Sequence, residues 1–225
     1  MSAVLAACSK KKTIFRNAAF SCLEQVLIHC RDQAVNEEAF AYVLQCSSIP
    51  SKEEANADAD EADTSYVSSL EKVLLCLKAS MTGVSISILG GRFGAITACL
   101  ADKLNGSYIW QVKMATLETI QTFIELVSKA SQDDQEQKHI VRSMEVLLFA
   151  ILECLGSVKI GQVRDTCLQC MLAMLGNADF RPQLVKNSGK RAHERLSLLN
   201  ELERNSSTKS LIQSALGLLS LDKVM

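Results

Sequence analysis

Cysteine and histidine side chains are the residues of this chain whose types could carry metal or redox chemistry. Cys167-Leu168-Gln169-Cys170 has the CxxC spacing found in zinc and thiol-disulfide sites. A zinc site needs two more ligands, and His139 and His193 form no paired pattern with it. A redox CxxC begins a helix after a strand, whereas this one falls inside an apolar helical pattern. We therefore predict that both cysteines are buried packing residues.

A second group, Cys22, His29 and Cys30, falls at i, i+7 and i+8 along one expected helix. This spacing could supply half of a metal site, but it also suits a core-facing helix surface, which we expect. Gly90-Gly91-Arg92-Phe93-Gly94 is rich in glycine like a phosphate loop, yet it lacks GxxxxGK(S/T) and follows no clear strand. The sequence contains no HExxH, GxSxG or kinase signature, so we assign no catalytic, cofactor-binding or metal-binding residue.

Two segments concentrate charge. Ser51–Thr64 carries six acidic residues against one base and no large apolar side chain, which predicts a disordered acidic loop over residues 51–64. We interpret it as a solvated insertion, with a recruitment tail as the alternative; the calcium-loop pattern fails at its sixth and twelfth positions. Asp179–Lys209 has a net charge of +3 but no aromatic side chain beyond Phe180 to stack on bases. There we expect an exposed basic face or a protein contact, and no nucleic acid.

The composition favours packed helices. The 225 residues are 48% hydrophobic and 22% charged with a net charge of -1, and they include only 2 Pro and 10 Gly. These values argue against whole-chain disorder, a globally basic nucleic-acid binder, and β-sandwiches or barrels. The longest strongly apolar stretch, Met144–Leu155, is too short to span a membrane and contains Glu145 and Glu153. We expect it to be a buried helix and expect no integral membrane segment.

The nine cysteines indicate a reducing compartment. Their number is odd, and most lie on apolar helical faces. No signal-peptide pattern precedes them, because the apolar Met1–Ala7 comes before Lys10-Lys11-Lys12, whereas a signal peptide has its charges first. We therefore expect a cytoplasmic or nuclear location, or both.

Helical periodicity runs along the whole chain. Residues Ile14, Ala18, Cys22 and Val26, with their neighbours Phe15, Ala19, Leu23 and Leu27, form one wide apolar face. Pro50 ends the third helix, and Asn105-Gly106 marks a turn. The glycines near residue 90 would kink a long helix. The expected helices cover about Ser2–Ser9, Lys12–Cys30, Val35–Ser47, Ser65–Ser80, Val84–Leu104, Tyr108–Ala130, His139–Leu155, Val158–Leu175, Ala192–Arg204 and Thr208–Leu221.

A degenerate repeat links several of these helices. A base followed by small or apolar residues recurs at Arg16, Lys113 and Arg164, separated by 97 and 51 residues. A weaker copy near Ser65–Val67 would split the first interval, giving a period close to 50, slightly above the roughly 40–47 residues of HEAT and armadillo repeats. We expect each base to reach a neighbouring carboxylate or helix end. The single tryptophan, Trp110, is expected to pack between repeats, with a binding anchor as the alternative.

The pattern predicts an all-α fold: a HEAT/armadillo-like α-solenoid of about four to five antiparallel helix pairs. Residues 1–225 would form a single solenoid segment, in which the first helix of each pair packs outside and the second lines the concave side. A globular helical bundle is the alternative. An exposed half-pair at Met1 would suggest a piece of a longer solenoid.

Several short strings, taken together in order and spacing, resemble the C-terminal region of the HEAT-repeat proteasome adaptor and scaffold family, especially its plant-like members. The resemblance covers Cys8 to about Leu219. The strings are Cys8-Ser9-Lys10-Lys11-Lys12, Ala19-Phe20-Ser21-Cys22-Leu23-Glu24, Trp110-Gln111-Val112-Lys113-Met114, Leu152-Glu153-Cys154, Val158-Lys159-Ile160 and Leu198-Leu199-Asn200-Glu201-Leu202-Glu203.

The resemblance implies a non-enzymatic scaffold that binds the proteasome and helps to hold its core and regulatory particles together, or links them to other machinery. Family members are much longer than this chain, and no family binding residue maps onto a position here, so the protein-binding residues stay unknown. The alternatives are a transport-receptor or phosphatase-scaffold HEAT segment with other protein partners, and an enzyme. Aligned acidic residues on successive second helices would favour a transport receptor. A deep pocket with a strongly shifted Cys or His would favour an enzyme.

Overall fold

The computed structural model describes residues 1–10, 12–48, 69–129 and 134–220. Within these ranges it contains eleven helices and no strand, which confirms the all-helical prediction. The helices gather into two compact units. Unit 1 comprises Met1–Arg92 and Gly106–Phe123, and unit 2 comprises Phe93–Asn105 and Ile124–Met225. That residues 1–225 form one continuous solenoid segment stays a prediction.

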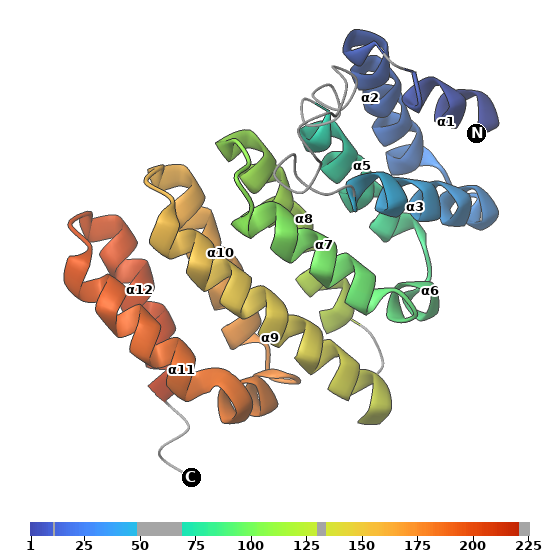
Figure 1. The fold of residues 1–225 in the computed structure, drawn as a ribbon. Helices are drawn as coiled ribbons and strands as arrows, with labels where there is room; N and C mark the ends of the chain where they lie inside the picture. Colours follow the sequence, from blue (N-terminus) through green and yellow to red (C-terminus); the bar gives the residue numbers. More distant parts are fainter. Residues whose placement is uncertain (11, 49–68, 130–133, 221–225) are drawn as a thin grey trace, which may run out of the picture. The chain divides into compact units, whose positions relative to one another are not determined.

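Unit 1 is built around α5. Helix α5 packs against both α2 and α3, while α1 packs against α2 (Figure 1). Thr119 in α8 adds a contact, because its hydroxyl donates to the Leu74 carbonyl in α5 at 3.2 Å. Phe20 and Phe40 fill the core between these helices. The helices of this unit are α1 (Ser2–Cys8), α2 (Thr13–His29), α3 (Gln33–Ser47), α5 (Leu70–Gly83), α6 (Ile86–Gly90) and the first part of α8 (Trp110–Ser128).

Unit 2 is a stack of helices in two rows. Helix α9 contacts α7 and α11, which makes one row, and α10 contacts α12, which makes the other (Figure 1). The consecutive pairs α9–α10 and α11–α12 join the rows. This is the packing of an α-solenoid, in which each helix pair buries its apolar faces against the next pair. The helices are α7 (Phe93–Asn105), α9 (Asp134–Ser157), α10 (Gly161–Gly176), α11 (Arg181–Leu202), α12 (Ser206–Ser220) and the last turn of α8.

Three predicted helices differ from those observed. Helix α9 begins at Asp134, five residues before the predicted start at His139. The expected helix Val84–Leu104 is divided into α6 and α7, because the chain leaves the helix at Gly91 and Arg92. Helix α11 begins at Arg181, about ten residues before the predicted start, because Pro182 lies in the first turn, where its missing N–H has no helical partner to lose. The predicted acidic loop, residues 51–64, and the weak repeat copy near Ser65–Val67 lie outside the described residues.

Buried hydroxyl groups are a recurrent feature of both units. Thr116 and Thr119 in α8, and Thr97 in α7, have side chains at most 3% exposed. Each donates to the carbonyl four residues earlier in its own helix, at 2.7–2.8 Å. Such a bond satisfies a hydroxyl inside a packed interface within its own helix, and Thr119 also donates to another helix, at the Leu74 carbonyl of α5.

Candidate functional site

Cys167 and Cys170 lie in the interior of α10, and both side chains are fully buried. Burial raises the pKa of the Cys170 thiol to about 12, so it carries almost no thiolate at neutral pH. The prediction that this CxxC packs in the core is confirmed. Within the described part of the chain, no group of three or more His, Cys, Asp or Glu side chains is arranged to hold a metal ion.

Cys22, His29 and Cys30 do not form the expected core face. The Cys22 and His29 side chains are exposed on α2, and Cys30 is half-buried at its end. The expected burial was therefore wrong for the first two residues. Seven of the nine cysteines are buried as predicted, so Cys22 is the exposed exception. The glycine-rich segment at residues 90–94 connects α6 to α7, and its Phe93 side chain is buried.

The basic stretch is partly used within unit 2. The Arg191 guanidinium lies 4.4 Å from the centre of the Phe149 ring, a cation–π contact. Arg181 donates to the Leu218 carbonyl at 3.0 Å. Arg195 pairs with the Glu153 carboxylate, and this contact lowers the pKa of Glu153. These bases are held by their own fold, which leaves Lys186 and Lys190 as exposed charges on α11.

Trp110 is not buried between helices. It is the first residue of α8, and its side chain is 42% exposed beside Ile109, which is 56% exposed. The packed face of this helix begins at Val112, which is fully buried. The expectation of packing between repeats was wrong, because the ring precedes the part of the helix that other elements cover. The alternative, a binding anchor, stays open.

The recurrent bases occupy one register at the starts of three helices. The backbone N–H groups of Arg16, Lys113 and Arg164 bond to the carbonyls of Lys12, Ile109 and Ile160, each four residues earlier. We call these three residues the first-turn bases. Lys209 has the same place in α12, bonded to the Asn205 carbonyl. This fourth member was not predicted from the sequence, although it lies 45 residues after Arg164.

The side chains of the first-turn bases fold back onto the segment before their own helix. Arg16 donates to the Lys10 carbonyl at 3.3 Å, and Lys113 donates to the Gly106 carbonyl at 3.0 Å. Arg164 donates to the carbonyls of Leu155, near the end of α9, and Val158, at 2.7 and 3.2 Å. A positive charge near a helix N-terminus is unfavourable, so these carbonyl contacts offset a local electrostatic cost. They also fix the turn that leads into the helix.

Arg164 makes a further ion pair with Glu203 at the end of α11. The side chains of Arg164 and Glu203 are only 18% and 9% exposed. Glu203 also accepts the Asn205 backbone N–H at 2.8 Å, and this bond, followed by Arg164, lowers the pKa of the Glu203 carboxyl. The expectation that the base reaches a helix end and a neighbouring carboxylate is confirmed at this position.

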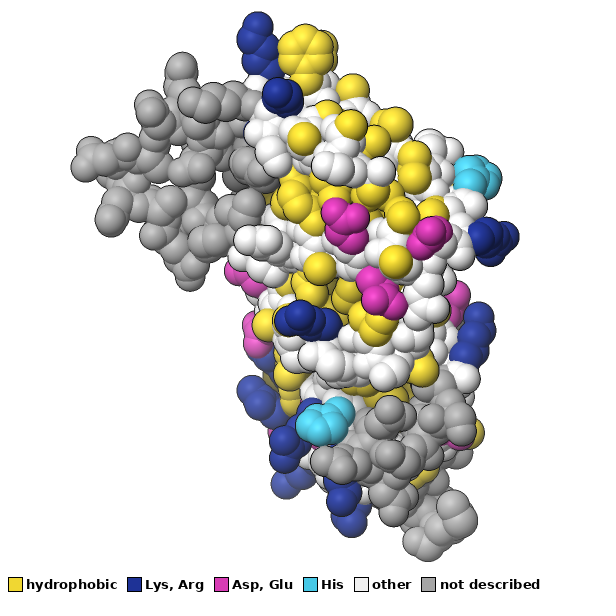
Figure 2. Space-filling model, turned by 90° about the vertical axis from the view of Figure 1, so that its right-hand side faces the viewer, with side chains coloured by type: hydrophobic (Ala, Val, Ile, Leu, Met, Phe, Trp, Pro, Cys, Tyr) yellow, Lys and Arg dark blue, Asp and Glu magenta, His cyan; other side chains and the backbone are white. Residues whose placement is uncertain are grey.

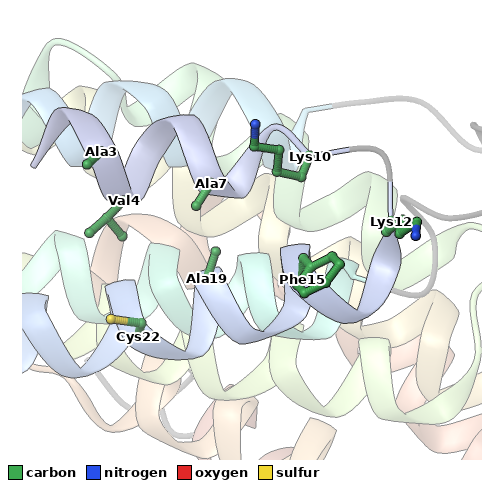
Figure 3. A pocket seen from close by; sticks show the side chains of 8 residues that line it. All are labelled: Ala3, Val4, Ala7, Lys10, Lys12, Phe15, Ala19 and Cys22. Carbon is green, nitrogen blue, oxygen red and sulfur yellow. The ribbon is translucent and has the colours of Figure 1, made fainter.

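An apolar groove lies between α1 and α2 in unit 1, with a volume of about 810 Å³. Ala3, Val4 and Ala7 line it from α1, and Phe15, Ala19 and Cys22 line it from α2; Lys10 and Lys12 stand at one end (Figure 3). We call this the α1–α2 groove. Figure 2 faces the side on which α1 and α2 lie, and it shows hydrophobic side chains gathered over the upper part, with basic side chains at the top edge.

The apolar face of α2 is therefore only partly used in the core. Phe20, Leu23 and Leu27 are buried, whereas Ile14 is 75% exposed and Phe15 is 61% exposed. The helical pattern had predicted one wide apolar face without showing which part of it is covered. The groove could be anticipated from that excess width, but not from any motif.

Models of known protein families and curated protein sequences give no match to this chain. Among the described residues, no helix is both long enough and apolar enough to cross a membrane. The described features are exposed apolar side chains, a groove and paired surface charges on a helical framework.

Proposed function

We propose that this protein is a non-enzymatic protein-interaction scaffold of the HEAT-repeat type, similar to the proteasome adaptor family. It would bind the proteasome and help hold the core and regulatory particles together, or link them to other machinery, in the cytoplasm, the nucleus or both. The observation that carries the proposal is the repeated first-turn base, which stands at the same register in α2, α8 and α10 and is buried in the first two and 18% exposed in the third. It indicates a structural unit used several times, as in repeat scaffolds.

Three of the sequence strings on which the resemblance rests contain residues that take part in the contacts of the first-turn bases. Lys113 belongs to one string, the Val158 carbonyl that accepts from Arg164 belongs to a second, and Glu203 ends a third. Sequence similarity at residues that have a structural role is better support for a shared fold than similarity at surface positions that can vary freely. This supports the family proposal.

The mechanism would be surface display. Helices pinned by internal contacts would present exposed side chains such as Phe15 and Trp110 at fixed positions, and partners would bind without chemical change. The acidic residues Glu118, Glu153 and Glu203 are each paired with a base of the same unit. These three carboxylates are therefore not free to meet basic partners of a transport receptor without giving up an internal ion pair.

The direct test uses purified proteasomes that contain both core and regulatory particles. The tagged full chain is mixed with them, salt is raised until the particles begin to separate, and the products are resolved on native gels. We expect the chain to co-migrate with the proteasome and to increase the joined fraction, whereas a helical repeat protein of similar size from an unrelated family does neither. No co-migration and no change in the joined fraction would refute the proposal.

A further inference from the structure

The α1–α2 groove has dimensions that suit the binding of a helix. Phe15, Ala19 and Cys22 are spaced i, i+4 and i+7 along α2, which corresponds to roughly 10 Å of helix length. Ala3 and Ala7 form a second row along α1, with Val4 between them (Figure 3). Three of these six side chains are alanines, so the axis of another helix can approach the groove closely. Two rows at helical spacing are the usual receptor for the apolar face of an amphipathic helix.

The charge at one end of the groove indicates what the occupant carries. Lys10 and Lys12 are exposed there, and the first turn of α2 contains no acidic residue. The N-terminal end of α2 contributes a partial positive charge at the same place. The groove floor is otherwise apolar. An occupant with hydrophobic residues along its length and carboxylates at one end would match both properties.

We propose that the α1–α2 groove binds an amphipathic helix of a partner protein, with its apolar face on α1 and α2 and its acidic C-terminal turn beside Lys10 and Lys12. The helix lies antiparallel to α2, because this direction brings both its carboxylates and the negative end of its dipole to the lysines. This inference rests on the proposed function, since it names the surface and the partner chemistry of a binding scaffold.

The probe is a synthetic helical peptide of about 16 residues with leucines at i, i+4, i+7 and i+11 and glutamates in its last turn. A matched peptide has lysines in place of the glutamates. Binding to the full chain is measured by fluorescence anisotropy. We expect the acidic peptide to bind at least tenfold more tightly than the basic one, with the difference shrinking as salt increases.

Two pairs of variants test the location. The double change Lys10→Glu with Lys12→Glu is expected to reverse the preference between the peptides. Its control, Lys186→Glu with Lys190→Glu, alters net charge equally on exposed α11 positions of unit 2 and is expected to change nothing. Cys22→Arg and Ala3→Arg each place a large side chain in the groove from exposed positions, so both should fold as the natural chain does. Each is expected to weaken binding of the acidic peptide at least tenfold.

Thiol chemistry gives an independent readout. Cys22 is the exposed cysteine of the described chain and lines the groove, so bound acidic peptide should protect it from alkylation. Equal affinity for the two peptides, no effect of the lysine reversal, or no protection of Cys22 would overturn the proposal. So would a dimer of the full chain that Cys22→Arg dissolves, because a second copy would then fill the groove.

This experiment separates the two proposals. If the natural chain joins proteasome particles and the Cys22→Arg variant does so equally well while failing to bind peptide, the scaffold proposal stands and the groove serves another partner. If the natural chain does not bind proteasomes at all, the family proposal fails. The peptide measurements still decide the groove chemistry, because they use no proteasome component.

Discussion

Replacing Arg164 with methionine tests whether the first-turn bases hold the helix stack together. Methionine keeps most of the apolar stem and the helix propensity but removes every hydrogen-bond donor. The lost contacts are those to the Leu155 and Val158 carbonyls, at 2.7 and 3.2 Å, and the ion pair with Glu203. The perturbation therefore removes one link between the end of α9, the start of α10 and the end of α11.

The expected cost follows from the burial of the partners. The Glu203 side chain is only 9% exposed, so without Arg164 its carboxylate keeps the backbone N–H groups of Asn205 and Arg204 but gains little solvent. Removing one partner of a fully buried pair costs about 3–5 kcal/mol. Arg164 itself is 18% exposed, which places this site toward the lower end of that range, at about 3 kcal/mol. With a urea dependence of about 2 kcal/mol per molar, the unfolding midpoint should fall by about 1.5 M.

The assay is urea unfolding followed by circular dichroism, with Arg195→Met as the matched control. Arg195 and Glu153 also form an Arg–Glu pair, but their side chains are 38% and 51% exposed. An exposed pair contributes at most about 0.5–1 kcal/mol, so this midpoint should move little. A double-mutant cycle with Glu203→Gln should give a coupling free energy of about 1–2 kcal/mol. If Arg164→Met lowers the midpoint no more than Arg195→Met does, the structural role assigned to these bases is wrong.

Three further outcomes are expected. The pKa of Glu203 is lowered in the folded chain. Its contribution to stability is therefore present above the unfolded pKa of about 4.3 and is lost as the pH falls through the folded pKa. Glu203→Gln should remove this part of the acid-unfolding profile measured by circular dichroism. Phe20→Ala should lower the free energy of unfolding by about 3–5 kcal/mol, because Phe20 is fully buried. Phe15→Ala should change it by less than about 1 kcal/mol, because the Phe15 side chain is 61% exposed. Similar urea midpoints for the two variants would contradict the packing described for α2. In the folded chain Cys22 should react with an aromatic disulfide reagent before the buried thiols do, as read by peptide mass spectrometry, and fast labelling of a buried cysteine would contradict its position.

Helical periodicity predicted the fold class well because every helix must bury an apolar stripe. The pattern in α9 is an example: Met144, Leu148 and Ile151 recur at helical spacing and are all fully buried. Helix ends were predicted less well where one residue type can either begin or end a helix. Pro182 breaks a helix in its interior but is accepted in its first turn, and only the structure shows which applies.

The candidate groove could not be predicted from the sequence for a different reason. Periodicity shows that a face is apolar, but coverage depends on which helices pack against it. The face of α2 is wider than its neighbours cover, so Leu23 is buried while Phe15 and Cys22 remain accessible. Conversely, the recurrence of Arg16, Lys113 and Arg164 was visible in the sequence, and their carbonyl partners became identifiable only when the turns before the helices were placed.

The buried hydroxyls that bond within their own helices bear on how freely this protein can change during evolution. Thr116 and Thr97 satisfy their hydroxyl groups on the Val112 and Phe93 carbonyls, which belong to the same helix in each case. Replacing Thr116 with valine removes the hydroxyl group together with its need for a hydrogen-bond partner, and it keeps the shape of the side chain. The expected change in folding free energy is therefore small. Such a position accepts threonine or valine at little cost in folding free energy. The architecture can therefore outlast recognisable sequence identity, and related chains should share the spacing of their first-turn bases longer than they share the residues between them.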